Sequence, residues 1–392
     1  MKERIKTLLL DANGAKPHAI FVNTVLRGVL GVRNYLDASS PLNRLPFAGR
    51  VLGKWYDSAS YMLDWREAFD QSPALEVENC NISNLFEYAR FRRAVAEYPL
   101  IIILHSAAGD DLSLLLRTVK WFQRRRGKLV VFLGNEYDLM SEKSAFLKAV
   151  SADFVCTQLP IESARWLYGE LTDTRILEMP HALNPRVYFP TSSRTRSIDI
   201  GFVGDLYPHF IGDVERTNLI YYFQTHAPNW NLSIDIRFQR MSRLKWAEFL
   251  RHSAGTIGGE SGTYYLDRRG EIVNRAKAFT KKNPHATFEQ LWANCFHDLP
   301  PFVSGRAVSS RHFEPIGTKT CQILLEGNYN HILQPEEHYI AVKKDLSNID
   351  EAVRRFKDKT YRDAIVERTY EYAMDQHTYA HRVNALINAV VG

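Results

Sequence analysis

Residues 98–190 alternate short apolar runs with longer amphipathic stretches, and this alternation limits the fold more than any other feature of the sequence. Apolar runs of strand length occur in the segments PLIIILHS, KLVVFLGNEYD, DFVCTQ and TRILEMPH, and apolar residues recur at helical spacing between them. Runs that are apolar on both faces are typical of buried parallel strands, which need long crossover connections. The stretch therefore predicts a parallel sheet with helices on both faces.

A second alternation follows the polar linker PTSSRTRS, which marks a domain boundary. Its expected strands are IDIGFVGD, LSIDIRF, AGTIGGESG, QILLEG and HYIAVKK. The sequence therefore predicts an α/β protein with two Rossmann-like parallel-sheet domains that face each other across a cleft. We expect an N-terminal domain over 1–190, a C-terminal domain over 191–360, and a C-terminal helix over 361–392 that packs back on the N-terminal domain.

The composition agrees with two globular domains. The chain has 392 residues, of which 45% are hydrophobic and 24% charged, and this length is more than one hydrophobic core usually serves. The four cysteines form no CxxC pair, so we expect neither a zinc site nor a disulfide framework, and a reducing cytoplasm fits. The apolar run Thr7–Leu10 is too short for the core of a signal peptide or for a membrane span.

Part of the net charge of +6 is bunched in the segments KWFQRRRGK and RFQRMSRLK. Such runs suit contact with nucleic acid, an anionic membrane face or a phosphorylated substrate, whereas cations at a helix end also complement the helix dipole. We favour the helix-end interpretation. We also interpret the aromatic and basic segment at residues 41–65 as ordinary packing rather than as a surface for an acceptor or a membrane.

Polar loops follow the predicted strands at the edge where ligands of open parallel sheets bind. They are HSAAGDD and GNEYD in the first domain, and GDLYPH, GGESG and a serine-rich helix start in the second. Glycine lets a backbone approach a phosphate closely, and a helix N-terminus offers free amides. The sequence lacks both GxGxxG and GxxxxGKS, which argues against a nicotinamide dehydrogenase and a P-loop ATPase.

The helix start at residues 309–315, SSRHFEP, is more polar than a cap requires. It is followed by QILLEGNYNHILQPEEHYIAVKKDLSN and preceded by GNEYD, TQLP and ALNPRVYFP, in order on the expected strands. This arrangement resembles GT-B glycosyltransferases, in particular the CgeB-like group of bacterial enzymes, over residues 98–380.

The resemblance implies an acceptor-side N-terminal domain and a nucleotide-sugar-binding C-terminal domain. The implied reaction moves a hexosyl unit from a UDP-sugar or GDP-sugar donor to a glycan or a lipid-linked glycan, without a metal or another cofactor. The implied setting is bacterial surface polysaccharide synthesis in the cytoplasm, with peripheral contact at the inner face of the cytoplasmic membrane. No nucleic acid is expected as a partner.

Carried over residue by residue, the resemblance places Glu314 against the ribose hydroxyls, because a carboxylate accepts two hydroxyl bonds at once. Arg311 and the amides that follow Ser309 would meet the diphosphate. The residues expected to bind the donor are Gly204, Asp205, Ser309, Ser310, Arg311, Glu314 and Lys319. A first-turn acid that satisfies the helix dipole is the alternative for Glu314, and a plain solvated lysine is the alternative for Lys319.

One position departs from the pattern of related retaining enzymes, in which two glutamates are spaced E-x7-E. The position eight before Glu314 is Arg306, and an insertion over residues 261–304 separates the preceding strand from the helix. Glu260 lies directly after that strand, so we expect it to contact the donor sugar. A capping or turn role for Glu260 is the alternative.

The base that deprotonates the acceptor hydroxyl is expected in the post-strand loops of the first domain. His105, Glu136 and Asp138 lie in these loops and are, together with Glu260, the candidate catalytic residues. His105 suits a base because a histidine titrates near neutral pH. A histidine after a strand is also commonly a hydrogen-bonded structural residue, which is the alternative here.

Two other functions are compatible with the same patterns. A sugar-nucleotide epimerase or hydrolase on this fold would need no acceptor groove. A non-catalytic nucleic-acid-binding protein would use the arginine runs, but these lack the interleaved stacking aromatics of a recognisable RNA or DNA module.

Overall fold

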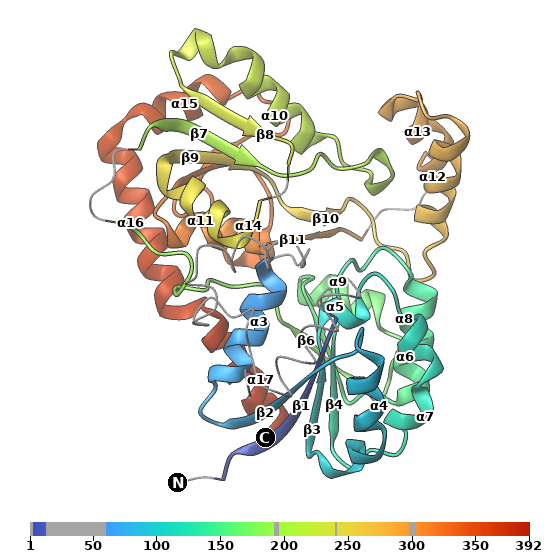
Figure 1. Ribbon diagram of the computed structural model, residues 1–392. Helices are drawn as coiled ribbons and strands as arrows, with labels where there is room; N and C mark the ends of the chain where they lie inside the picture. The colour runs from blue at the N-terminus through green and yellow to red at the C-terminus, as the bar shows by residue number, and fades with distance from the viewer. Residues whose placement is uncertain (1–2, 13–59, 192–195, 240, 298–302) are drawn as a thin grey trace.

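Two α/β units lie one above the other in Figure 1, the N-terminal unit below and the C-terminal unit above. This computed structural model describes residues 3–12, 60–191, 196–239, 241–297 and 303–392. Of the aromatic and basic segment at 41–65, residues 41–59 lie outside the described residues, and so do residues 192–195 of the predicted linker.

Six described strands form the parallel sheet of the N-terminal unit, in the spatial order β2-β1-β3-β4-β5-β6. The strands are β1 (Ile5–Asp11), β2 (Leu75–Asn81), β3 (Leu100–Ile103), β4 (Lys128–Phe132), β5 (Phe154–Thr157) and β6 (Arg175–Glu178). The helices are α3 (Ser60–Gln71), α4 (Leu85–Ala94), η2 (Val95–Glu97), α5 (His105–Ala108), α6 (Ser113–Arg117), α7 (Val119–Phe122), α8 (Met140–Val150) and α9 (Ile161–Leu167).

The N-terminal sheet is buried on both faces, as its apolar runs predict. Along β3, Ile101 and Ile103 belong to one hydrophobic core and Leu100 and Ile102 to the other. Each of these side chains is at most 1% exposed. Successive strand residues point to opposite faces, so a continuous apolar run is what a sheet between two helical layers requires.

The C-terminal unit has a second parallel sheet, and its described strands follow the spatial order β13-β12-β9-β7-β8. The strands are β7 (Ile198–Val203), β8 (Ile234–Arg237), β9 (Ser253–Gly258), β12 (Cys321–Leu325) and β13 (Ile340–Val342). The helices are η3 (His209–Ile211), α10 (Glu215–His226), η4 (Ala227–Trp230), α11 (Arg243–His252), α14 (Ser310–Gly317), η5 (Tyr329–His331) and α15 (Ile349–Lys357). The predicted fold class, with two Rossmann-like parallel-sheet units, is confirmed.

The insertion leaves and re-enters the C-terminal unit through an antiparallel pair, β10 (Ser261–Thr263) and β11 (Gly305–Ala307). Between these strands, α12 (Glu271–Lys282) and α13 (Phe288–Cys295) form a helical pair beside the junction of the units (Figure 1). The pair has a core of its own, made by Tyr265, Ala276, Leu291, Cys295 and Phe296. The insertion is therefore a small folded element of the C-terminal unit, with a hydrophobic core of its own.

The last two helices pack on different units. α16 (Lys359–Gln376) contributes Ala373 to a core of the C-terminal unit, whereas α17 (Tyr379–Val391) contacts α3 and contributes Leu386 to a core of the N-terminal unit. At the break between them, Thr378 caps α17 through its side chain. No helix in the described part of the chain is long and apolar enough to cross a membrane.

The first basic run lies at the end of α7, where its cations were expected to sit. Arg125 donates to the carbonyl oxygen of Phe122, the last residue of α7, at 3.1 Å, and it pairs with Asp153 at 3.2 Å. The guanidinium thus satisfies a helix-end carbonyl and balances a neighbouring carboxylate.

Candidate functional site

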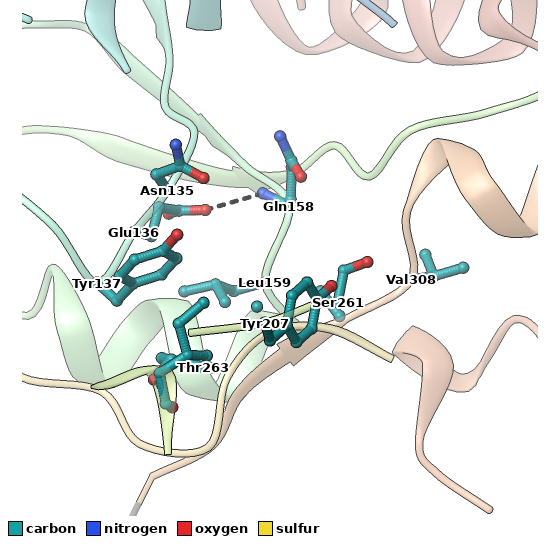
Figure 2. Close-up of a pocket in the computed structure, with 13 residues that line it drawn as sticks. Asn135, Glu136, Tyr137, Gln158, Leu159, Tyr207, Ser261, Thr263 and Val308 are labelled. Carbon is teal, nitrogen blue, oxygen red and sulfur yellow. Dashed lines mark hydrogen bonds between the residues drawn. The ribbon is translucent and has the colours of Figure 1, made fainter. Parts of the chain in front are cut away.

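A cavity of about 170 Å³ lies between the two units at the carboxyl ends of both sheets (Figure 2). We call it the interdomain cavity. The loops after β4 and β5 line it from the N-terminal unit, and the loop after β7 together with the β10–β11 pair lines it from the C-terminal unit. Its lining residues are Asn135, Glu136, Tyr137, Gln158, Leu159, Tyr207, Ile211, Ser261, Gly262, Thr263, Gly305, Ala307 and Val308.

A smaller cavity of about 60 Å³, which we call the C-unit cavity, lies within the C-terminal unit. Its lining residues are Phe202, Val203, Tyr207, Arg216, Trp246, Thr256, Ile257, Gly258, Gly259, Ser261, Arg311, His312, Gln322 and Leu324. Tyr207 and Ser261 line both cavities, so the two adjoin. This is the edge at which open parallel sheets bind ligands.

The guanidinium groups of Arg216 and Arg311 give the C-unit cavity a positive charge. The Arg311 guanidinium lies 4.7 Å from the centre of the Trp246 ring, and its side chain is 44% exposed. The Arg216 guanidinium lies 4.3 Å from the centre of the Tyr207 ring. Stacking on an aromatic face fixes a guanidinium while its N–H groups stay available to an anion.

The start of α14 lies between the two cavities. The Ser309 amide donates to Nδ1 of His312 at 2.9 Å, and the Ser261 hydroxyl donates to the Ser309 hydroxyl at 2.8 Å. Ser310 is 4% exposed. Burial lowers the pKa of His312 to about 4, so its ring is neutral at physiological pH. Ser309 and Ser310 therefore build the helix start, and their contact with a donor stays a prediction.

Glu314 is buried behind the wall of the C-unit cavity rather than on it. Its carboxylate accepts a hydrogen bond from Nε1 of Trp246 at 2.7 Å and lies 3.9 Å from the Arg311 guanidinium. The residue is 1% exposed. In this arrangement Glu314 orients two residues that do line the cavity, and its contact with a ribose stays a prediction.

Gly204 and Asp205 follow β7 and support Arg216. The Asp205 carbonyl oxygen accepts from the Arg216 guanidinium at 3.2 Å, and a Cβ atom on Gly204 would lie 3.4 Å from that guanidinium. Lys319 lies just before the amino end of β12, where its ammonium pairs with Glu367 of α16 at 2.6 Å. Gly204 and Asp205 thus contact a residue that lines the C-unit cavity, Lys319 lies apart from it, and donor binding by these three residues stays a prediction.

Glu136 is the predicted catalytic residue that lines the interdomain cavity. Its carboxylate accepts from the Thr157 hydroxyl at 2.6 Å, from the Tyr168 hydroxyl at 2.5 Å and from the Gln158 amide at 3.2 Å, the last drawn in Figure 2. Burial raises the pKa of Glu136 above its ordinary value, while these donors oppose the shift. Such a carboxylate is poised to accept a proton.

His105 and Asp138 are placed differently. His105 is 4% exposed and lies among aromatic rings, 5.2 Å from Phe132 and 5.4 Å from His181 between ring centres. Burial lowers the pKa of His105 to about 3, so its imidazole is a weak base. Asp138 pairs with Lys277 of the insertion at 2.6 Å. The structure thus places His105 in a core and Asp138 in a contact between the N-terminal unit and the insertion.

Glu260 takes the turn role that the sequence left open for it. Its carboxylate accepts from the Tyr329 amide at 2.7 Å, and burial raises its pKa. Its Oε2 lies so close to Gly327 that a Cβ there would be 2.5 Å away. Arg306, in the place of the first glutamate of the E-x7-E pattern, pairs with Glu215 at 2.8 Å. A sugar contact for Glu260 stays a prediction.

Several lining residues were not singled out from the sequence, although most lie in motifs that were. Tyr137 belongs to GNEYD, Gln158 to TQLP and Tyr207 to GDLYPH, all after strands. Their position after a predicted strand was the signal that could have found them. Arg216 and Trp246 lie on helices, and they reach the C-unit cavity through tertiary packing that no local sequence pattern predicts.

A buried ion cluster joins the two units behind the cavities. Arg243 of α11 donates to Asp64 at 2.7 Å and to Glu67 at 2.6 Å, both on α3. Asn184 donates to the same two carboxylates at 2.7 and 2.9 Å. Burial raises the pKa of Asp64 to about 7, and the two carboxylates raise that of Arg243, which therefore stays protonated.

Residues 246–388 match the family model described as glycosyl transferase-like. The matched stretch includes Trp246, the insertion, α14 and both final helices, and it leaves residues 1–245 uncovered. The two parallel-sheet units face each other across adjoining cavities, and the matched stretch lies in the second unit and the final helices. The chain has the GT-B fold. The predicted resemblance to GT-B glycosyltransferases is thereby confirmed, and the CgeB-like subgroup stays a prediction.

Solved structures overlap with nearly the whole chain at low identity. HepE of Anabaena, solved in complex with UDP-glucose, has a TM-score of 0.48 and 10% identity, over 99% of this chain and 100% of that one. BGT of T4 phage, solved with its UDP-glucose substrate, has a TM-score of 0.49 and 9% identity, over 98% and 99%.

A glycosyltransferase of Rickettsia africae has a TM-score of 0.49 and 10% identity, over 99% of this chain and 98% of that one. These overlaps are too loose to carry a substrate or a mechanism across. A comparison with curated protein sequences gave no significant match.

Proposed function

We propose that this protein is a hexosyltransferase that moves a sugar from a nucleotide-sugar donor, such as a UDP-sugar or a GDP-sugar, to a glycan or lipid-linked glycan. The observation that carries this proposal is the pair of adjoining cavities at the carboxyl ends of both sheets. One cavity is positively charged and the other is neutral apart from a buried carboxylate. A donor with a diphosphate and a sugar matches this division.

The donor diphosphate belongs in the C-unit cavity. Arg216 and Arg311 both line it, and their guanidinium groups suit phosphate oxygens because they present several N–H donors in one plane. Glycosyl transfer leaves negative charge on the departing diphosphate, and fixed positive groups stabilise that charge as it develops. In this proposal the two arginines carry out that task without a metal.

The transferred sugar and the acceptor hydroxyl belong in the interdomain cavity. Tyr137 and Tyr207 offer ring faces there, and Asn135 and Gln158 offer amide groups that hydrogen-bond to hydroxyls. Glu136 is proposed to accept the proton of the attacking hydroxyl, because its raised pKa moves it toward the range that suits a general base.

The test begins with thermal-shift measurements against UDP-, GDP-, CMP- and dTDP-sugars, since a ligand that binds the folded state raises the melting temperature. The variants Arg216→Ala and Arg311→Ala should each weaken binding of the selected donor about 10- to 100-fold, because each removes a hydrogen-bonded charge pair. Binding of the matching nucleoside, which has no phosphate, should stay unchanged.

Arg354→Ala is the matched control, since Arg354 lies on α15 with a side chain that is 74% exposed and pairs with Glu351. If no sugar nucleotide binds, or if the two cavity variants bind the donor as well as the control does, the proposal fails. Incubation with the donor alone separates a transferase from an epimerase or a hydrolase, which would release an epimer or the free sugar.

The proposed setting is surface polysaccharide synthesis in the cytoplasm, at the inner face of the membrane. The net charge of +6 is consistent with attraction to anionic lipid headgroups. Cosedimentation with vesicles that contain anionic lipid tests this contact, and no binding above that to neutral vesicles would remove it from the proposal.

A further inference from the structure

Lys143, on α8, is a buried lysine directly behind the wall of the interdomain cavity. It is 0% exposed. Its ammonium donates to the carbonyl oxygens of Gly134 at 2.7 Å, Asn135 at 2.9 Å and Asp138 at 2.8 Å. An ammonium has three N–H donors and each of them has an acceptor here, which is the condition under which a buried lysine is tolerated.

All three acceptors belong to the short loop that joins β4 to α8. The same loop carries Asn135, Glu136 and Tyr137 into the lining of the interdomain cavity. Its backbone is strained, because Asn135 has φ 47° and Leu139 has φ 53°, in the left-handed region that residues other than glycine rarely adopt. Such conformations persist where surrounding contacts impose them.

The loop is also held from outside, but less firmly. Asp138 pairs with Lys277 at 2.6 Å, and these side chains are 33% and 37% exposed. Exposed pairs of this kind contribute little to stability. Within the protein, three donors hold the side chain of Glu136, and Lys143 holds the backbone carbonyl groups of the loop.

Burial destabilises the charged form of Lys143, and nearby carboxylates stabilise it. Burial lowers the pKa of Lys143 to about 8. Glu136, Asp138, Asp110 and Glu142 oppose this shift through their charges. A methionine at position 143 would fill a similar volume without burying a charge. What the ammonium adds is its three hydrogen bonds to the loop backbone.

We propose that Lys143 is a positioning residue that fixes the β4–α8 loop and thereby sets the acceptor-facing wall of the interdomain cavity. This inference rests on the proposed function for its kinetic consequence. It assigns Lys143 an effect on the transfer step and none on binding of the donor's nucleoside diphosphate, because Arg216 and Arg311 lie in the other unit.

The experiment compares Lys143→Met with Lys148→Met. Lys148 lies on the same helix and pairs with Glu170, and its side chain is 50% exposed. In Lys143→Met, kcat/KM for the acceptor should fall about 10- to 100-fold, the loss expected when a reacting group is displaced by about 1 Å. The Kd of the matching nucleoside diphosphate should stay within about twofold of wild type, and Lys148→Met should match wild type in both measurements.

Hydrogen exchange supplies a readout that needs no substrate. Amides 134–138 of Lys143→Met should exchange at least about tenfold faster than in wild type, while the amides of β7, β9 and β12 keep their protection. The inference is overturned if the loop exchanges at the wild-type rate, or if binding of the nucleoside diphosphate falls together with acceptor turnover. If no sugar nucleotide binds at all, the proposed function fails, and loop exchange still decides the role of Lys143.

A pH series on the wild-type protein keeps the inference testable should Lys143→Met not fold. Above pH 8 the neutral amine has two N–H donors for three carbonyl oxygens, so one hydrogen bond is lost. Exchange of amides 134–138, corrected for the intrinsic effect of pH, should therefore rise between pH 7 and 9.5. A corrected rate that does not change across this range contradicts the inference.

Discussion

Glu136 shows how single side chains prepare the site. A carboxylate taken out of water binds its proton more tightly, and three donors around Glu136 keep its ionised form accessible. The donors come from β5, from the residue that follows it and from the residue after α9, so the position of the carboxylate is fixed by the N-terminal sheet itself. A base held by the sheet does not have to reorganise when the acceptor binds.

Replacing Glu136 by glutamine should lower kcat for transfer by at least about 100-fold, because general-base catalysis contributes about that much or more. Donor affinity should not change. In wild type, kcat should fall as the pH drops through the raised pKa of Glu136, since the base acts in its ionised form. Steady-state rates from pH 4.5 to 8 measure both effects. Glu142→Gln, on the exposed side of α8, is the control, and an unchanged kcat in Glu136→Gln would exclude the base role.

At the scale of residues, the sequence identifies loops better than it identifies contacts. GNEYD was placed correctly after a strand, and Glu136 within it lines the interdomain cavity. Arg216 could not be found, because its approach to Tyr207 depends on how α10 packs. Lys319 is five residues from Glu314, yet it lies beyond the end of α14, near the amino end of β12 and away from the cavities. Proximity in sequence failed there because a helix intervenes.

Among the elements, strands with a clear apolar run were predicted both inside the sheets and at their edges, and β1 and β2 were missed. β3 and β4 read as continuous apolar runs because helices cover both of their faces. The interior strand β1 has such a run too, but Asp11 ends it early and the run was interpreted only as too short for a signal peptide or a membrane span. β2 lies at the sheet edge, and its sequence LEVENCN has no apolar run to detect.

The insertion behaves as an element that spans the junction of the units. Arg268 donates to the Trp166 carbonyl oxygen at 2.9 Å, and its guanidinium lies 4.6 Å from the centre of the Trp166 ring. Ser141 donates to the Arg269 carbonyl oxygen at 2.9 Å. These contacts tie the N-terminal unit to a segment whose two ends line the interdomain cavity.

Arg268→Ala should loosen this tie without unfolding either unit. An exposed cation–π contact and a hydrogen bond to a carbonyl are each worth about 1 kcal/mol or less, so the melting temperature should change by only a few degrees. Amides of α12 and α13 should exchange faster in the variant. Arg269→Ala is the control, because the Arg269 side chain is 78% exposed and its carbonyl is retained. Equal exchange in the two variants would show that Arg268 does not hold the insertion.

At the scale of the whole molecule, the buried ion cluster makes the contact between the units depend on pH. Burial raises the pKa of Asp64 to about 7 in the folded protein, whereas an unfolded aspartate loses its proton near its ordinary pKa of 3.8. Between these values the folded state binds more protons than the unfolded state. The contribution of Asp64 to the free energy of unfolding therefore falls as the pH rises through this window and is lowest above pH 7.

Asp64→Asn should flatten that slope, because an amide keeps the Oδ1 acceptor for Arg243 and Asn184 but does not titrate. Urea denaturation at intervals between pH 4.5 and 8 measures the free energy of unfolding in both proteins. The wild-type curve should decline relative to the variant toward pH 7. Asp363→Asn, on the exposed face of α16, should follow wild type. Parallel curves for wild type and Asp64→Asn would contradict the assignment.

The described chain passes between the two units at two places, and these places are bonded to each other. Leu183 and Thr378 form a parallel bridge, in which the Leu183 amide donates to the His377 carbonyl oxygen at 2.8 Å and the Tyr379 amide donates to that of Leu183 at 3.1 Å. Any movement of one unit relative to the other therefore displaces both passages together, because these two hydrogen bonds join them.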